Sequence, residues 1–242
     1  MTHGSPDWGQ FDPIKTVYRV TDLGELAARL NVTQCFSRSG TVLWWDDFED
    51  NINKWVVDPS GAGAAAELST DKARSGGKSA KLTTGDEAND DTSLCRYMGI
   101  PPASSKMGFE ISFVLHISVE FMIYIYVYYN SSLYLAGIRT NWPNNKVEYY
   151  NESAAWADLL TTFPINVDPI WTTWKLIMDF SGDGEYIKLI QNADDQDVSG
   201  KYCRKVSTSN ADVVYIFLVA TAKAAANNSI YVDDFVLTYN EP

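Results

Sequence analysis

Hydrophobic and polar positions alternate along much of this chain after residue 41, as they do in β-strands that bury one of their two faces. In FEISFVLHISV, residues 109–119, every odd-numbered position is apolar and most even-numbered positions are polar. In FMIYIYVYY, residues 121–129, one face is apolar up to Val127, and the other carries Met122 and three tyrosines. Further runs that favour strands occupy residues 133–140, 146–151, 171–180, 185–192, 213–221 and 229–239.

Turn-forming residues separate these runs. SGDG at residues 181–184 predicts a hairpin turn, and NWPNN at residues 141–145 predicts another turn. Two acidic stretches, TTGDEANDD (83–91) and ADDQD (193–197), are interpreted as a solvated loop and a turn. The whole pattern predicts an all-β fold, an antiparallel two-sheet jelly-roll sandwich.

The first 43 residues depart from this pattern. The stretch TDLGELAARL predicts one short helix near residues 22–30, because its leucines recur on one helix face. These leucines are Leu23, Leu26 and Leu30. We therefore expect an extended N-terminal arm over residues 1–43 and a sandwich domain over residues 44–242. So short a helix needs a surface to pack against, which is either its own domain or another subunit.

Charge excludes several classes of partner. The chain of 242 residues has a formal net charge of −12. Nucleic acid and anionic membrane surfaces are therefore not expected as partners, because both attract clustered Lys and Arg. The opening residues contain no apolar leader and no run is long enough for a membrane span, so we expect synthesis in the cytoplasm without a signal peptide.

Cysteines and histidines bear on the chemistry that the chain can perform. Cys35, Cys95 and Cys203 are widely spaced, so three buried free thiols are expected, with one bridge plus one thiol as the alternative. The two histidines, His3 and His116, show no partner arrangement for a nucleophile. No nucleophile, metalloprotease or phosphate-loop motif is present, and no alternating acidic array of a sandwich glycosidase is found. The prediction is therefore a protein that is not an enzyme.

The chain opens and closes with related acidic motifs. The opening reads DDFED with a tryptophan following (46–55), ARSGGKSAKL occupies residues 73–82, and the closing strand reads YVDDFVL (231–237). This order resembles the jelly-roll sandwiches of carbohydrate-binding modules and their galactose-binding-like relatives. The resemblance covers residues 44–242 and implies that the first and last strands lie side by side.

The same resemblance implies a structural calcium ion between these motifs. Its oxygen ligands would come from the opening acids, from backbone carbonyl groups of the loop at residues 72–75 and from the closing acids, because Ca²⁺ takes hard oxygen ligands from several segments. The residues carried over from the resemblance are Glu49, Asp47, Lys72, Ser75 and Asp234. The alternative is that these acids face solvent or pair with Lys and Arg.

A tyrosine row is the candidate binding surface. Tyr124, Tyr126 and Tyr128 share one face of one predicted strand, since they lie two residues apart. Aromatic residues of neighbouring strands that could join them are Tyr134, Trp142, Tyr149 and Trp156. Three interpretations stay open: the second face of a strand buried between layers, a protein interface, or a platform for sugar rings.

The N-terminal segment has a resemblance of its own. YRVTDLGELAARL, followed by Phe36, Arg38 and Gly40 and then by the DDFE strand, is similar to uncharacterised bacteriophage structural proteins. The expected function is a non-enzymatic virion structural protein of the capsid-decoration, turret or fibre type, on the virion surface. Its partners would be itself, as a trimer or dimer, a capsid or other virion protein, and host surface glycans. The alternative is an extracellular glycan-binding module.

Overall fold

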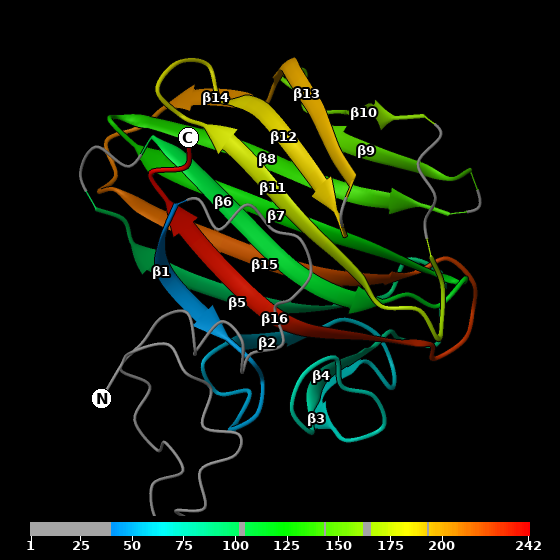
Figure 1. Ribbon diagram of the computed structural model, residues 1–242. Helices are drawn as coiled ribbons and strands as arrows, with labels where there is room; N and C mark the ends of the chain where they lie inside the picture. The colour runs from blue at the N-terminus through cyan, green and yellow to red at the C-terminus, as the bar shows by residue number, and fades with distance from the viewer. Residues whose placement is uncertain (1–39, 102–104, 143, 162–165, 193) are drawn as a thin grey trace, which may run out of the picture.

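The computed structural model describes residues 40–242 apart from residues 102–104, 143, 162–165 and 193. Within this part the chain forms two antiparallel sheets stacked face to face, which confirms the predicted sandwich (Figure 1). Sheet I runs in the order β13-β12-β11-β6-β16-β4-β3, with β1 also paired to β16. Sheet II runs in the order β10-β9-β8-β7-β15-β5-β2, with β14 also paired to β8.

The strands of sheet I are β1 (Thr41–Asp46), β3 (Ala65–Ser69), β4 (Ser79–Thr83), β6 (Lys106–Val114), β11 (Thr172–Asp179), β12 (Glu185–Gln191), β13 (Asp194–Tyr202) and β16 (Ser229–Tyr239). The strands of sheet II are β2 (Val56–Pro59), β5 (Asp91–Gly99), β7 (Val119–Tyr129), β8 (Ser132–Asn141), β9 (Lys146–Tyr150), β10 (Trp156–Leu160), β14 (Arg204–Ser207) and β15 (Val213–Ala222).

The core lies between the sheets, where the alternating apolar positions meet. Phe113 of β6 packs against Phe121 of β7, with ring centroids 4.8 Å apart, and against Trp174 of β11 at 4.9 Å. All three rings are buried, so they join the two sheets at the centre of the sandwich. The predicted run 109–119 is not one strand, because β6 ends at Val114 and a turn leads to β7.

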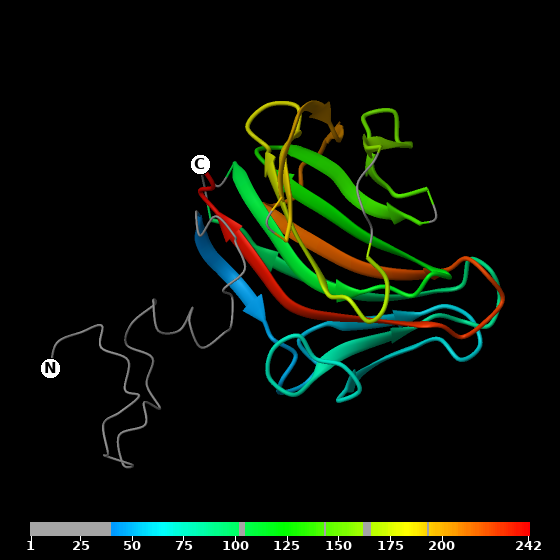
Figure 2. The same cartoon turned by 45° about the vertical axis from the view of Figure 1, so that its right-hand side comes forward.

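The first and last strands of the sandwich lie side by side, as the resemblance implies. Thr41 is paired with Tyr239 at one end of β1, and Asp46 with Phe235 at the other. Both views show β1 in blue beside β16 in red (Figures 1 and 2). The chain therefore enters and leaves the sandwich at the same place, in sheet I.

Asp46 at the end of β1 is fully buried and has three donors. Its carboxylate accepts hydrogen bonds from Nε1 of Trp55 (2.8 Å), Nζ of Lys54 (2.8 Å) and the backbone N–H of Phe48 (3.2 Å). Trp55 in turn packs edge-on against Phe235 of β16, with centroids 5.4 Å apart. The first acid of the opening motif thus anchors the turn after β1 to the core.

Of the two acidic stretches, ADDQD was wrongly interpreted as a turn, and TTGDEANDD is confirmed as a loop. ADDQD was interpreted as a turn, but Asp194 to Asp197 belong to β13, which pairs only with β12 at the edge of sheet I. An edge strand tolerates polar residues because its outer side meets water; Asp195, for example, pairs with Lys188 of β12 at 2.8 Å. The stretch 83–91 is a loop between β4 and β5 apart from its first and last residues.

The structure describes two of the three cysteines but not the predicted N-terminal helix. This helix, near residues 22–30, lies outside the described residues, and so do its leucines, Leu23, Leu26 and Leu30. Cys35 lies outside them as well. Cys95 and Cys203 are free thiols; Cys203 is buried and Cys95 is half-buried, so burial was predicted correctly for Cys203 alone. No helix in the described part is long and apolar enough to cross a membrane.

Candidate functional site

The outer face of sheet II carries a continuous group of aromatic side chains. Cross-strand pairing puts Tyr126 of β7 beside Tyr215 of β15 and Tyr215 beside Tyr97 of β5, all pointing away from the core. We call this group the aromatic face; it comprises Tyr97, Tyr124, Tyr126, Tyr128, Tyr150, Trp156, Tyr215 and Phe217. Its members alternate along their strands with buried residues such as Ile125 and Ile216.

The rings of the aromatic face touch one another across the sheet. Tyr124 lies 5.5 Å from Trp156 between ring centroids, and Trp156 lies 5.5 Å from Tyr150. Tyr126 packs on Phe217 at 5.1 Å. At the other end Tyr215 contacts Tyr128 at 5.8 Å and Tyr97 at 5.7 Å, and Tyr97 is 58% exposed. The result is a surface of partly exposed rings across most of the strands of sheet II.

A glycine in β8 lets the rings of Tyr124 and Trp156 come this close. A Cβ at Gly137 would lie 2.9 Å from the carbonyl oxygen of Ile123, 3.2 Å from the ring of Tyr124 and 3.4 Å from the ring of Trp156. A side chain here would press on the backbone carbonyl oxygen of Ile123 and shift the ring of Tyr124. The centre of the aromatic face therefore depends on a residue without a side chain.

A buried tyrosine from the opposite sheet supports the same spot. The β8–β9 ladder ends with Ile138 opposite Tyr149, and the next two residues, Gly137 and Tyr150, are bridged by the hydroxyl of Tyr186 from β12. That hydroxyl accepts the N–H of Gly137 at 3.0 Å and donates to the carbonyl oxygen of Tyr150 at 2.9 Å. Burial raises the pKa of the Tyr186 phenol well above its usual value, so it stays protonated.

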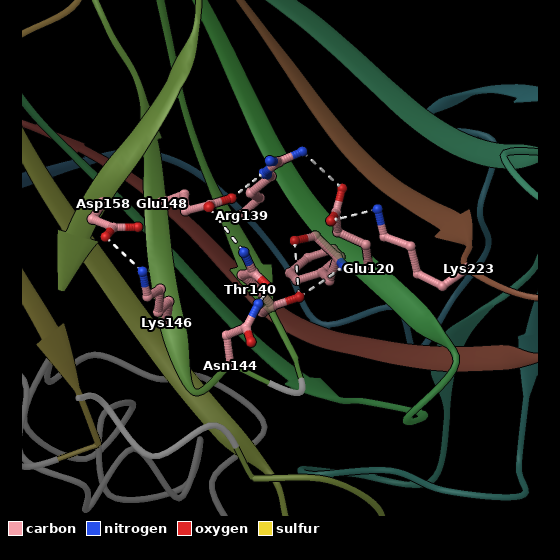
Figure 3. A network of polar contacts seen from close by, with 10 residues as sticks. Glu120, Arg139, Thr140, Asn144, Lys146, Glu148, Asp158 and Lys223 are labelled. Carbon is pink, nitrogen blue, oxygen red and sulfur yellow. Dashed lines mark hydrogen bonds and ion pairs between the residues drawn. The ribbon is translucent and has the colours of Figure 1, made fainter. Parts of the chain in front are cut away.

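A network of ion pairs lies on the same side of sheet II, and Figure 3 shows it from close by. The guanidinium of Arg139 donates to Glu148 at 2.6 Å and to Glu120 at 3.2 Å, and Lys223 pairs with Glu120 at 2.6 Å. Lys146 pairs with Asp158 at 2.7 Å. We call this group the charged row; its members are Glu120, Arg139, Lys146, Glu148, Asp158 and Lys223. Arg139 also lies over the ring of Trp156, 4.6 Å from its centroid, and so links the charged row to the aromatic face.

The tyrosine hydroxyls of the central strand are available to a ligand. Within the described part of the chain, no residue hydrogen-bonds to the hydroxyl of Tyr124, Tyr126 or Tyr128. Partial burial raises the pKa of Tyr124 and of Tyr126, so both phenols keep their protons at neutral pH. The rings thus offer apolar faces together with hydroxyls that can donate or accept hydrogen bonds.

The structure separates the aromatic residues that the sequence grouped together. Tyr124, Tyr126 and Tyr128 lie on the aromatic face, and Trp156 joins them. Tyr134 and Tyr149 do not, because their positions in β8 and β9 point into the sandwich: Tyr134 packs on Phe180 and Tyr149 on Tyr186. Trp142, just after β8, packs against the core as well.

Four members of the aromatic face were missed from the sequence: Tyr97, Tyr150, Tyr215 and Phe217. Tyr215 and Phe217 alternate with Val214 and Ile216 inside a predicted strand, so the signal was present. Without knowledge that β15 pairs with β7, this alternation did not show which surface the two rings join. Tyr97 lies in β5, which was not predicted as a strand.

The residues expected to hold calcium are brought together in part. Ser75 Oγ donates to Asp234 at 2.6 Å, and Glu49 accepts the N–H groups of Gly77 and Lys78, each at 2.8 Å. Asp47 accepts the N–H of Glu49, and Lys72 pairs with Asp168. These carboxylates therefore have N–H or O–H donors from protein groups.

Side-chain clusters give no further support for a metal. Among the described residues, no group of three or more Asp, Glu, His or Cys is arranged to hold a metal ion. Calcium binding stays a prediction, which unfolding temperatures measured with calcium and with a chelator would test. Identical temperatures would contradict it.

Two acids on the outer face of sheet I are buried and have raised pKa values. Desolvation raises the pKa of Glu110 on β6 to about 7, against the opposing charge of Lys175 beside it. Desolvation, with a contribution from Asp234, raises the pKa of Asp233 on β16 to about 7. Asp233 accepts the N–H groups of Arg74 (2.8 Å) and Ser75 (3.2 Å), so it ties that loop to the last strand.

These two acids predict a pH dependence of stability. In the unfolded chain their pKa is about 4, so between pH of about 4 and 7 the folded protein binds more protons than the unfolded one. The free energy of unfolding therefore falls as pH rises through this window. We expect it to be about 1–3 kcal/mol lower at pH 8 than at pH 5.5 in urea titrations.

The matched variant for this prediction is Glu110→Gln. It removes one of the two titrations and should reduce the difference between pH 5.5 and pH 8. A wild-type protein equally stable at both pH values, or a variant with an unchanged slope, would contradict the assignment.

His116 is the one histidine among the described residues, and its contacts are structural. Its Nδ1 accepts the N–H of Ser118 at 3.2 Å in the turn between β6 and β7. It contacts neither the aromatic face nor the charged row through any hydrogen bond between described residues.

Comparison with known proteins bears on the fold. No protein-family model and no curated protein matches the chain. Among solved structures, an endo-β-1,4-glucuronan lyase from the fungus Trichoderma reesei superposes with a TM-score of 0.55 at 11% identity, covering 82% of this chain and 95% of that chain. This chain is a jelly-roll β-sandwich.

Two further structures share this jelly-roll sandwich. The cellulose-induced protein Cip1 superposes with a TM-score of 0.53 at 14% identity, covering 81% of this chain and 96% of its own. A carbohydrate esterase of the Shiga toxin-encoding bacteriophage phi24B superposes with a TM-score of 0.53 at 16% identity, covering 84% of this chain and 100% of its own. At these identities the likeness shows a shared fold. Any function has to be argued from the residues of the site.

Proposed function

We propose that this protein binds carbohydrate through the aromatic face of sheet II. The observation that carries the proposal is the cluster at Tyr124, Tyr150 and Trp156, where three rings lie within 6.2 Å of one another between centroids and remain partly exposed. Aromatic rings stack on the C–H faces of sugars, and adjacent phenols supply hydrogen bonds to sugar hydroxyls. The aromatic face offers both over several strands.

The arrangement favours binding over catalysis. Glu120 and Glu148 of the charged row both accept hydrogen bonds from Arg139, which also lies over the ring of Trp156. A carboxylate whose oxygens already accept from a guanidinium is poorly placed to exchange a proton with a bound sugar. We therefore propose a binding protein that leaves its ligand chemically unchanged. Incubation of polysaccharide with the protein tests this part of the proposal, because cleavage would release new chain ends.

Binding itself is tested with polysaccharides in affinity gel electrophoresis followed by calorimetry. The double variant Tyr124→Ala/Trp156→Ala removes the two rings beside Gly137 and should weaken binding by roughly 100-fold, because stacked aromatics at the centre of an interface dominate affinity. The matched control is Trp45→Ala, which removes a ring that is 45% exposed on β1 of sheet I. It should bind as the wild type does.

Two results would contradict the proposal. One is a wild-type protein that binds no polysaccharide of a broad panel. The other is a double variant that binds as tightly as the wild type, since the ligand would then lie elsewhere.

The virion assembly prediction depends on the arm over residues 1–43, of which residues 1–39 lie outside the described part of the chain, so no observation of the structure supports it. It remains a separate prediction, for which sedimentation of the full chain and of a chain beginning at Thr41 is the direct test. An oligomer that becomes a monomer on truncation would support an assembly arm.

A further inference from the structure

The charges around the aromatic face restrict the class of sugar that it can take. We propose that the ligand is a neutral polysaccharide rather than a polyanionic one such as a polyuronate. This inference rests on the proposed function and goes further by naming the ligand class.

Arg139 is the cation of the charged row that contacts the rings of the aromatic face. Arg139 lies over the ring of Trp156, and its guanidinium donates to two carboxylates, Glu148 at 2.6 Å and Glu120 at 3.2 Å. These two carboxylates already offset the charge of the guanidinium, so a ligand carboxylate would be a third anion beside it. Arg139 is thus arranged to hold Trp156 in place rather than to hold an anion.

The other two cations of the charged row, Lys146 and Lys223, are paired with carboxylates as well. Lys223 is paired with Glu120 at 2.6 Å, and Lys146 with Asp158 at 2.7 Å. Each described cation of the charged row therefore already faces a carboxylate. None of these three is left over to neutralise a sugar acid. On the same face, Arg204 of β14 is exposed beside Leu135 and forms no ion pair with a described residue.

Two more carboxylates, Asp91 of β5 and Asp58 of β2, lie at the other end of the same face. Strand pairing places Asp91 of β5 beside Thr221, which is opposite Glu120, and Asp58 of β2 beside Ser93. Both acids therefore point outward, with no described cation in an ion pair with either. Burial, with the nearby charges of Asp58 and Asp90, raises the pKa of Asp91. The five acids named on this face, Glu120, Glu148, Asp158, Asp91 and Asp58, outnumber its four cations, Arg139, Lys146, Lys223 and Arg204, and the chain has a net charge of −12.

These charges suit a neutral ligand well. Carboxylates accept hydrogen bonds from sugar hydroxyls, and the tyrosine hydroxyls both donate and accept. A uronate, in contrast, would bring a negative charge toward Glu120, Glu148 and Asp158. Like charges brought together at an interface oppose binding, and the effect weakens as salt screens them.

The test uses pairs of oligosaccharides that differ only in charge. β-1,4-Glucan, β-1,3-glucan and β-1,4-mannan oligomers are each compared with the same oligomer oxidised to the carboxylate at C6. Calorimetry at low and high salt gives the two dissociation constants of each pair. We expect the neutral member of the pair that binds best to bind at least about tenfold more tightly at low salt, with a smaller ratio at high salt.

A second variant tests the role of Glu120 and Glu148 directly. Glu120→Gln/Glu148→Gln removes both carboxylates that hold Arg139 and frees its guanidinium. The ratio of uronate to neutral affinity should then rise by at least about fivefold relative to the wild type. An unchanged ratio would overturn the role given to these two residues.

The outcomes separate this inference from the proposed function. Tight binding of the neutral oligomers with weak binding of the uronates supports both. Equal or tighter binding of the uronates overturns the neutral-ligand inference while leaving carbohydrate binding in place. Binding of neither member of any pair overturns the proposed function and the inference with it.

Discussion

Replacing Asp46 with alanine is expected to lower the free energy of unfolding by about 3 kcal/mol. The carboxylate is fully buried at the end of β1 and accepts hydrogen bonds from Trp55, Lys54 and the backbone of Phe48. Its removal leaves the indole N–H and a backbone N–H inside the core without an acceptor. Because Trp55 packs on β16, the loss should spread to the pairing of the first and last strands.

The measurement is urea unfolding followed by tryptophan fluorescence, with Asp50→Ala as the control. Asp50 is exposed and only four residues away, so its loss should change stability by less than about 0.5 kcal/mol. If Asp46→Ala is as mild as the control, the donors around Asp46 have found other acceptors. The account of the opening motif as an anchor would then be wrong.

Replacing Tyr186 with phenylalanine should cost about 2 kcal/mol of stability and loosen the aromatic face from beneath. The hydroxyl bridges Gly137 and Tyr150 where the β8–β9 ladder stops, and it comes from the opposite sheet. Phenylalanine fills the same space but leaves a buried N–H and a buried carbonyl group unsatisfied. The effect is therefore that of lost hydrogen bonds alone.

Two readouts check this prediction. Urea unfolding gives the stability, and amide hydrogen exchange should show faster exchange at Gly137 in the variant. Tyr149→Phe is the matched control, because Tyr149 packs on Tyr186 at 5.2 Å and its hydroxyl has no hydrogen-bond partner among the described residues. Unchanged exchange at Gly137 in Tyr186→Phe would contradict the bridging role.

Most of the long strands of the sandwich were predictable because their side chains alternate strictly; β5, with nine residues, was not predicted. Residues 121–127 show this best: the odd positions form the core and Tyr124 and Tyr126 face outward, as expected. The short strands β2, β3 and β14 were not predicted, since four or five residues carry too little alternation. The start of β13, in the stretch ADDQD, was taken for a turn because its acids resemble loop composition, although pairing with β12 decides its conformation.

The candidate site was predictable only along a single strand. Tyr124, Tyr126 and Tyr128 follow from a period of two, but which residues lie beside them depends on strand order, which no local pattern contains. Tyr134 and Tyr149 were wrongly added for this reason, since a shift of one residue turns a side chain to the other face. The motif resemblance did predict the pairing of β1 with β16, because it linked segments distant in sequence.

The pairing of Thr41 with Tyr239 has a geometric consequence for how the domain is carried. Both ends of the sandwich lie in sheet I, whereas the aromatic face is on the outside of sheet II. A partner attached at either end is therefore on the far side from the ligand and leaves the rings uncovered. Several copies attached to one support in this way would present their aromatic faces outward together. A repeating polymer would then be held at many points, and the overall avidity would exceed the affinity of any single domain.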